Sequence, residues 1–196
     1  MNKMHRREAV KELLQDRGDL LVVTGLGASA YDLASTGDCA LDFPLWGAMG
    51  GAAVLGLGLA LAQPERQVLV LTGDGEMLMG LGSLATIGTQ HPGNLHIVVL
   101  DNEAYGETGQ QPTHTGSGVD LAAVAGGCGF PRTAVLTQLA EVETLRQEIH
   151  SVHELSFTVL KIFTEDLPRV LPARDGPYLT HRVREALLGT ARALES

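Results

Sequence analysis

Two polar side chains follow two strongly apolar runs of the sequence. Asp74 comes after the run QVLVLT of residues 67–72, and Asn102 follows the run LHIVVLD of residues 95–101. Apolar runs without polar alternation are typical of strands covered on both faces. If the two strands are parallel neighbours, Asp74 and Asn102 lie together at one edge of the sheet. A carboxylate and an amide oxygen suit Mg²⁺, which takes few protein ligands and fills its shell with phosphate oxygens and water.

The residues around Asp74 suit a phosphate group as well as a metal. Gly73 and Gly75 allow a diphosphate to approach the backbone closely. The helix expected from about Leu78 would point its N-terminal amides at that anion. Taken singly, Asp74 is more readily a helix cap and Asn102 a turn residue. Their occurrence together, each after a buried strand, favours the metal site.

The elements that would position these residues alternate along the chain. Strands are expected over residues 20–24, 67–72, 95–101 and 157–162, and helices over 3–17, 51–62, 78–90, 120–126, 138–151 and 178–194. This alternation predicts an α/β fold, a three-layer sandwich with a mostly parallel central sheet. An irregular stretch is expected up to about Leu45, and a loop over residues 102–118. We expect one domain over residues 1–196, with its core at about 20–165 and helical extensions at both ends.

Composition excludes several classes of protein. Apolar residues make up 44% of the 196 residues and charged residues 19%, so the chain can bury a core. The net charge of −9 argues against nucleic-acid binding. Cys39 and Cys128 form no disulfide framework, which suits a reduced, cytoplasmic compartment. The charged N-terminus does not resemble a signal peptide. Residues 43–64 carry no charge, but their glycines and Pro44 favour a buried turn and helix over a membrane span.

A glycine-rich turn offers a competing interpretation. Gly25, Gly27 and Ala30 fit the G-x-G-x-x-A pattern of dinucleotide-binding turns. That pattern also requires an acidic residue ending a second strand about 20 residues further on. Asp38 and Asp42 lie at roughly that distance, but no strand is expected before them. The turn therefore favours an ordinary connection from strand to loop.

The spacing of the first two motifs resembles a known family. GDG at residues 73–75, with Asp101 and Asn102 26 positions further on, is similar to the thiamine diphosphate (ThDP) motif of ThDP-dependent enzymes. Asp101 stands where the family commonly has a first Asn. The resemblance implies that the side chains of Asp74 and Asn102 and the carbonyl of Ala104 bind Mg²⁺. It also implies that ThDP lies against further residues of both motifs, namely Gly73, Gly75, Glu76, Tyr105 and Gly106.

A second segment carries the same resemblance. Residues 45–50, LWGAMG, are similar to the segment that holds the aminopyrimidine ring of ThDP in the family's decarboxylases. The resemblance implies that Gly47, Ala48 and Met49 contact the cofactor. Met49 matches the bulky side chain that keeps ThDP bent. Read alone, Met49 is ordinary core filling. Together the motifs imply the pyrophosphate-binding (PP) domain of this family over about residues 20–165, with decarboxylation of a 2-oxo acid as its chemistry.

The family also needs a part that this sequence lacks. A catalytic Glu comes from a pyrimidine-binding (PYR) domain, and one PP domain accounts for the whole chain. We therefore expect a partner, a PYR-domain α subunit, in a hetero-oligomer of α₂β₂ type or larger. The chain would be the β subunit, bind no nucleic acid or membrane, and be inactive alone.

The loop after Asn102 indicates the substrate class. Its run YGETGQQPT resembles the split decarboxylases of the sulfopyruvate and phosphonopyruvate type. Gln110, Gln111, Thr113 and His114 are candidates to bind a small anionic 2-oxo acid, and His114 could move protons. Between Arg66 and Arg132 the sequence has no Lys or Arg, so a cation for the substrate's anionic group is expected from the partner.

Three other functions remain open at this point. One is another ThDP-dependent lyase or carboligase that forms acetolactate or an acyloin. A second is a noncatalytic binding subunit that keeps the motif as a scaffold. The third, a 2-oxoacid:ferredoxin oxidoreductase, is disfavoured because two isolated cysteines cannot hold an iron–sulfur cluster.

Overall fold

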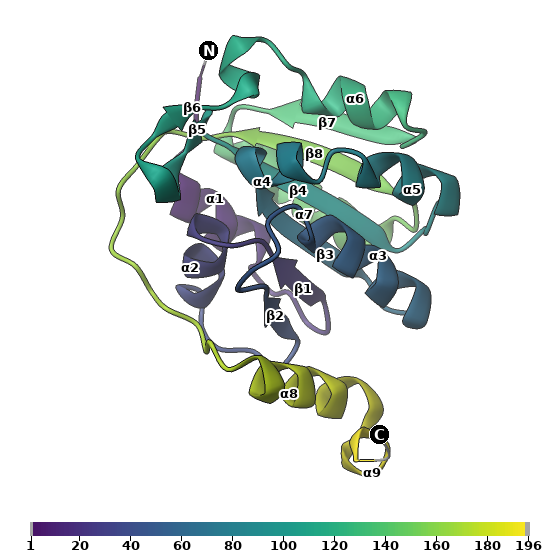
Figure 1. Cartoon of the computed structure of the whole chain (residues 1–196). Helices are drawn as coiled ribbons and strands as arrows, with labels where there is room; N and C mark the ends of the chain where they lie inside the picture. Colours follow the sequence, from purple (N-terminus) through teal and green to yellow (C-terminus); the bar gives the residue numbers. More distant parts are fainter. Residues whose placement is uncertain (1, 195–196) are drawn as a thin grey trace.

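The computed structural model of the chain describes residues 2–194 and is built around one sheet (Figure 1). All six strands of this sheet are parallel. Their spatial order is β2 (Asp42–Pro44), β1 (Leu21–Thr24), β3 (Val68–Gly73), β4 (Leu95–Asp101), β8 (Ser156–Lys161) and β7 (Arg132–Leu136). The carboxyl ends of all strands therefore meet along one edge of the sheet.

Helices cover both faces of the sheet, and each face has its own apolar core. One core is formed with α3 (Ala52–Ala62), α4 (Asp74–Met79), α5 (Ser83–Gln90) and α6 (Leu121–Gly127). The other is formed with α1 (Arg6–Leu13), α2 (Ala28–Ala34) and α7 (Leu139–Ser151). The predicted three-layer α/β sandwich is confirmed.

The sequence of β3 shows why two cores form. Val68 and Val70 belong to the first core, whereas Leu69 and Leu71 belong to the second. Successive side chains of a strand point to opposite faces, so an unbroken apolar run supplies both cores at once. The same holds for β4, which is buried over its full length and has the bounds that the sequence predicted.

The two ends of the chain differ in how they pack. The first helix is shorter than predicted, because the backbone turns left-handed at Asp16 and Gly18. It packs against α7 and contributes to the second core, so it is part of that layer. At the other end, residues 163–175 run from β8 to α8 (Gly176–Leu188), which lies against the edge strand β2 and precedes α9 (Thr190–Ala193). Residues 1, 195 and 196, which the predicted domain includes, lie outside the described residues.

Several short elements were not predicted. The stretch expected to be irregular contains α2 and β2, and the edge strand β7 was missed because its residues are only partly buried and its pattern is not uniformly apolar. The single helix expected over residues 78–90 is two helices, since the backbone of Gly80 passes so close to Gly50 that a side chain would not fit there. None of the helices within residues 2–194 has the length and apolarity needed to cross a bilayer.

The segment 102–118 is more structured than a loop. It contains an antiparallel strand pair and two short 3₁₀ helices: β5 (Ala104–Tyr105), β6 (Gln111–Pro112), η1 (Gly106–Thr108) and η2 (His114–Ser117). The segment lies at the carboxyl edge of the main sheet, directly after β4 (Figure 1).

Candidate active site

Asp74 lies at the centre of a buried polar cluster at the carboxyl edge of the sheet. Its side chain is 2% exposed, and its Oδ2 accepts hydrogen bonds from the hydroxyls of Thr113, at 2.5 Å, and Thr115, at 3.1 Å. Burial raises the pKa of Asp74 to about 6, helped by the negative charge of Asp101 and opposed by the two hydroxyls. The site therefore holds a carboxylate whose charge is only partly compensated by the chain itself.

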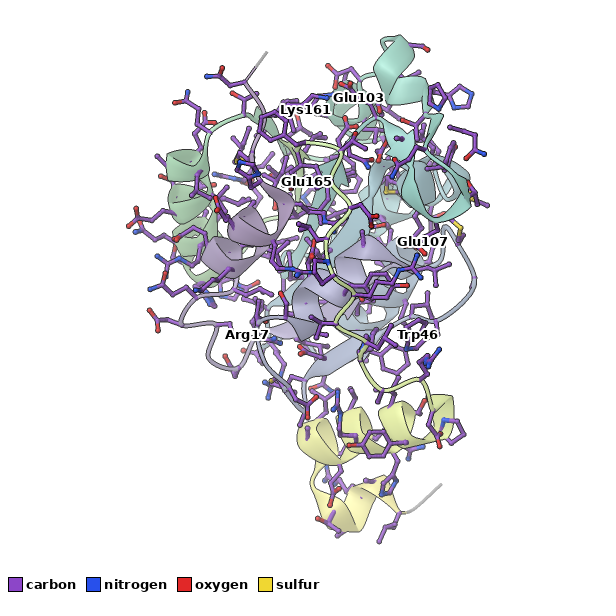
Figure 2. The ribbon with its side chains drawn as sticks, turned by 90° about the vertical axis from the view of Figure 1, so that its left-hand side faces the viewer. Arg17, Trp46, Glu103, Glu107, Lys161 and Glu165 are labelled. Atoms are coloured by element: carbon purple, nitrogen blue, oxygen red, sulfur yellow. The ribbon has the colours of Figure 1, made fainter. Side chains whose placement is uncertain are left out.

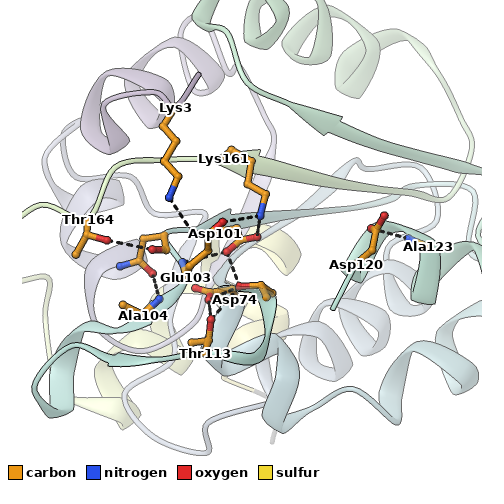
Figure 3. Close-up of polar contacts among 12 residues, drawn as sticks. Lys3, Asp74, Asp101, Glu103, Ala104, Thr113, Asp120, Ala123, Lys161 and Thr164 are labelled. Carbon is orange, nitrogen blue, oxygen red and sulfur yellow. Dashed lines mark hydrogen bonds and ion pairs between the residues drawn. The ribbon is translucent and has the colours of Figure 1, made fainter. Parts of the chain in front are cut away.

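Asp101 and Lys161 form the second half of this cluster (Figure 3). Lys161 Nζ donates to Asp101 Oδ2 at 2.7 Å, and the single hydroxyl proton of Thr115 is shared between Asp101 Oδ1, at 2.8 Å, and Asp74 Oδ2. Burial disfavours the charge of Lys161, but its bonds to Asp101 and Glu103 hold its pKa above the usual value. The carboxylate that replaces the family's first Asn is thus neutralised by a lysine from the next strand.

Asn102 and Ala104 lie where the sequence placed them. Gly73 pairs with Leu100 in the register of β3 and β4, so Asp74 and Asp101 follow at neighbouring positions and Asn102 comes one residue later. Asn102 Oδ1 accepts a hydrogen bond from the amide of Ala104 at 3.1 Å. The side-chain oxygen Oδ1 of Asn102 has a second lone pair, which remains available to a ligand.

The donor set fits a small hard cation. Both threonine bonds to Asp74 use Oδ2, and Oδ1 makes no side-chain hydrogen bond within residues 2–194. A side chain built on Gly73 would meet no atom within 4 Å, so open space adjoins the motif. A carboxylate, an amide oxygen and a carbonyl beside open space are ligands that Mg²⁺ takes together with a diphosphate.

Glu76 lies below this edge, inside the core. The hydroxyl of Thr72 donates to its carboxylate, as does the amide of Ala52 at the start of α3, at 3.3 Å. Burial raises the pKa of Glu76, and these hydrogen bonds oppose the rise. The carboxylate also fills the space where a side chain at Gly25 would lie. Glu76 therefore ties α4 to α3 and to the turn after β1.

These contacts also bear on the dinucleotide interpretation. Gly25 packs on Glu76, and Gly27 packs on Glu107. Asp42 begins a strand instead of ending one, and its carboxylate pairs with Arg17 at 2.5 Å. The glycines of the turn thus serve close packing, and the acidic residue is already engaged.

Residues 46–50 present Met49 to the surface. Ala48 has a left-handed backbone, with φ of 53°, and its carbonyl accepts from the amide of Gly51 at 2.8 Å. This tight turn leaves Met49 39% exposed, so Met49 is not core filling. Nothing lies within 4 Å of where a side chain at Gly47 would begin. The segment therefore offers an open backbone beside an exposed apolar side chain.

Within the 102–118 segment, two residues turn toward Asp74 and their neighbours turn away. Thr113 and Thr115 are buried against the carboxylate, whereas Gln111 and His114 are exposed. Thr113, a candidate substrate ligand in the sequence, is thus committed to Asp74. The ring of Tyr105 packs on Gly75, which closes the segment over the motif. The T-x-T spacing of residues 113–115 was the available signal for these contacts.

Comparisons with known proteins agree with this geometry. The family described as "Thiamine pyrophosphate enzyme, C-terminal TPP binding domain" matches residues 24–162. The solved structure of a putative thiamin diphosphate-dependent enzyme from Mycobacterium smegmatis has the same fold, with a TM-score of 0.69 and 24% identity over 83% of this chain and 32% of that one.

Three curated relatives are more similar in sequence. The sulfopyruvate decarboxylase subunit beta of Methanocaldococcus jannaschii is 41% identical, over 70% of this chain and 73% of that protein. The subunit of that name from Methanothermobacter thermautotrophicus is 46% identical, over 65% and 68%. The phosphonopyruvate decarboxylase of Streptomyces viridochromogenes is 47% identical over 63% of this chain, but only 31% of its own length is covered.

Proposed function

This chain belongs to the thiamine pyrophosphate enzymes, and from that premise we propose that it is the β subunit of a two-component, ThDP- and Mg²⁺-dependent decarboxylase of sulfopyruvate or phosphonopyruvate. The observation that carries the proposal is the position of Asp74 and Asn102 just after the carboxyl ends of the adjacent parallel strands β3 and β4. The chain matches most of the length of two proteins named as β subunits, which supports the assignment of the subunit.

In this proposal the two motifs hold the diphosphate end of the cofactor. The side chains of Asp74 and Asn102 and the carbonyl of Ala104 bind Mg²⁺. The backbone at Gly73, Gly75 and Gly106 and the ring of Tyr105 border the diphosphate, while Glu76 supports the turn from below. Thr113 and Thr115 orient the Asp74 carboxylate.

The exposed segment holds the other end of the cofactor. The backbone of residues 47–49 contacts the aminopyrimidine, and the Met49 side chain keeps ThDP bent. When bound, ThDP supplies the carbanion chemistry and the electron sink for decarboxylation. Gln111 and His114, both exposed on the segment that borders the motif, bind the substrate, and His114 moves a proton near neutral pH.

The assembly completes this site. One PP domain over residues 1–196 meets a PYR-domain α subunit, which contributes the catalytic Glu, in a cytoplasmic hetero-oligomer of α₂β₂ type or larger. The open space beside Gly47 and Gly73 and the exposure of Met49 support a site that a second chain closes.

The test is to purify the tagged chain from its native host, identify the co-purifying polypeptide and measure released ThDP. The assembled complex is then assayed for CO₂ release from sulfopyruvate and phosphonopyruvate, with an Asp74→Ala complex as control. We expect a stoichiometric partner, bound ThDP and CO₂ release that the control lacks. A ThDP-loaded complex that decarboxylates neither acid would make this a binding subunit, and acetolactate or acyloin as product would make it a carboligase.

A further inference from the structure

The segments that form the candidate site contain no cationic side chain. The sequence has no Lys or Arg between Arg66 and Arg132, a range that includes both metal-binding motifs and the 102–118 segment. Lys3 and Lys161 reach this edge, but both pair with Glu103, and Lys161 also pairs with Asp101. A sulfonate or phosphonate needs a positive partner, so the described site is incomplete without another source of charge.

The structure brings two arginines to this edge from a distant part of the sequence. Residues 163–175, which we call the strap, cross from β8 to α8. The strap includes Glu165 and passes Glu107 and Trp46 (Figure 2). The strap is fixed at both ends of the candidate site: Thr164 donates to the carbonyl of Asn102 at 3.0 Å, and Trp46 Nε1 donates to the carbonyl of Ala173 at 2.7 Å.

Arg169 lies between these two anchors in the sequence, and Arg174 directly follows the second one, Ala173. The guanidinium of Arg169 lies 5.7 Å from the ring centre of Tyr31 and 3.8 Å from the carboxylate of Glu107, on the segment that follows Asn102. Arg174 lies 5.7 Å from the ring centre of Trp46, which directly precedes Gly47. One arginine therefore adjoins the substrate segment and the other adjoins the proposed aminopyrimidine segment.

Both arginines keep their hydrogen-bond donors free. Within residues 2–194 neither donates a hydrogen bond, and the only carboxylate near Arg169 is at the long distance of 3.8 Å. By contrast, Arg7, Arg17 and Arg182 each pair with a carboxylate at 2.5 to 3.1 Å. A cation–π contact holds a guanidinium near the ring without using its N–H groups, which stay available to bind an oxyanion through two parallel bonds.

We infer that the strap arginines Arg169 and Arg174 bind the anionic group of the substrate, a sulfonate or a phosphonate. The inference rests on the proposed function and changes one part of it, because this chain and not its partner then supplies the cation. Arg169 makes the main contact, since it lies against the segment that carries Gln110 and Gln111. Arg174 adds charge from the side of Trp46.

The test compares substrates that carry a sulfonate or phosphonate group with pyruvate, which has the same 2-oxo carboxylate but lacks that second anionic group. The α–β complex is prepared with Arg169→Ala, Arg174→Ala, both changes, or Arg169→Lys. Arg192→Ala, an exposed arginine on α9, is the matched control. For each complex, kcat/KM is measured for sulfopyruvate, phosphonopyruvate and pyruvate, together with the dissociation constant of ThDP and the size of the assembly.

We expect Arg169→Ala to lower kcat/KM for sulfopyruvate and phosphonopyruvate at least about tenfold, mainly through KM, and the double variant to lower it further. Pyruvate kinetics, ThDP affinity and assembly should stay within twofold of the wild type. Arg169→Lys should restore part of the loss, since it keeps the charge but not the paired bonds. The Arg192→Ala control should behave as wild type.

Three results would overturn the inference. Equal losses for pyruvate and for the two acids with a sulfonate or phosphonate group would mean that the arginines only support the fold. Weaker ThDP binding, with the preference for sulfopyruvate and phosphonopyruvate over pyruvate unchanged, would assign the arginines to the cofactor's diphosphate. Loss of assembly would assign them to the partner interface. A wild-type complex that decarboxylates pyruvate alone is a different result, because it contradicts the proposed substrate before any variant is made.

Discussion

Strands β4 and β8 bury polar side chains at both ends, and the two ends differ in how they treat charge. At the amino ends, His96 Nδ1 lies 2.8 Å from Ser156 Oγ, and His96 Nε2 lies 3.1 Å from Gln67 Oε1. Burial and nearby positive charges lower the pKa of His96 to about 4, so this cluster is neutral. At the carboxyl ends, Asp101 and Lys161 form a buried ion pair next to Asp74.

The difference shows that the molecule keeps buried charges at the carboxyl ends of the strands, although burying a charge is energetically unfavourable. A buried polar group is tolerated when its bonds are satisfied internally, as at His96. A buried carboxylate beside a second carboxylate is unfavourable unless a cation compensates it. Lys161 compensates Asp101, but the side-chain donors to Asp74 are only the hydroxyl of Thr113 and that of Thr115, whose proton is shared with Asp101. That shortfall at the carboxyl edge is the physical argument for a bound metal ion there.

Replacing Asp74 should have the largest effect of any change at either end of the strands, and the effect should be on ThDP binding. We expect Asp74→Asn to weaken Mg²⁺-dependent ThDP binding by the complex about 1,000-fold, because even changes behind a metal ligand cost 10- to 100-fold. Titration calorimetry measures this. Ser156→Ala at the amino end is the control and should leave ThDP binding unchanged, while losing about 1 kcal/mol of stability. Undiminished binding by Asp74→Asn would rule out the metal site.

The same variant should stabilise the cofactor-free chain. The pKa of Asp74 is raised to about 6, so its folded protonated form is favoured at low pH and that stability is lost as pH rises from about 4 to 6. Asp74→Asn should therefore raise the unfolding free energy at pH 7 and have little effect near pH 4. A buried carboxylate that costs stability is what a trade of stability for metal binding would leave in the cofactor-free chain.

Lys161→Met should have the next largest effect. It leaves Asp101 buried without its cation, so we expect a loss of about 3 kcal/mol in urea unfolding of the chain. The double variant Asp101→Asn with Lys161→Met removes both charges and should recover most of that loss. If the single and double variants were equally unstable, the lysine would act by packing and not by charge.

The sequence was sufficient to predict the carboxyl edge, and for a physical reason. Long apolar runs define β3 and β4, and parallel pairing of those strands fixes Asp74 beside Asp101 and Asn102. The partners of Asp74 could not be predicted in this way. Thr113 and Thr115 follow no strand of the main sheet, and only the folded segment brings them to the carboxylate.

The strap shows a second limit of prediction from sequence. Residues 163–175 have no periodic pattern, because an extended segment held by single hydrogen bonds needs none. Arg169 lies more than 60 residues from Glu107 in the sequence, yet the two side chains are 3.8 Å apart. The sequence therefore predicted that the site lacks a cation, and only the structure indicated where one could come from.

Met49→Ala should have a smaller effect, confined to turnover. Met49 is exposed and belongs to neither core, so removing its side chain should cost the chain little stability. If it keeps ThDP bent, kcat should fall about tenfold while Mg²⁺ affinity changes less than twofold. Met49→Leu, which keeps the bulk, is the matched control and should retain most of the turnover. Unchanged kcat in Met49→Ala would show that another residue shapes the cofactor.

The smallest expected effect is a pH dependence of the unfolding free energy that arises from His96, at the amino end of β4. His96 titrates at about 4 in the folded chain and near 6.5 when unfolded, so the unfolded chain takes up its proton first as the pH falls. The stability that neutral His96 provides is complete above about pH 7 and declines toward pH 4. Between pH 7.5 and 5.5 we expect the wild type to lose about 1 kcal/mol of stability relative to His96→Gln.

That measurement also tests whether the two ends are independent. His181→Gln, on an exposed position of α8, is the control and should keep the wild-type pH profile. The difference between wild type and His96→Gln isolates His96 from Asp74, whose contribution changes with pH in the opposite direction. Because the two clusters lie at opposite ends of β4 and β8 and share no side chain or hydrogen bond, the effects of His96→Gln and Asp74→Asn on unfolding should add. A coupling above about 0.5 kcal/mol would mean that β4 transmits strain between its ends and that the neutral cluster also supports the site.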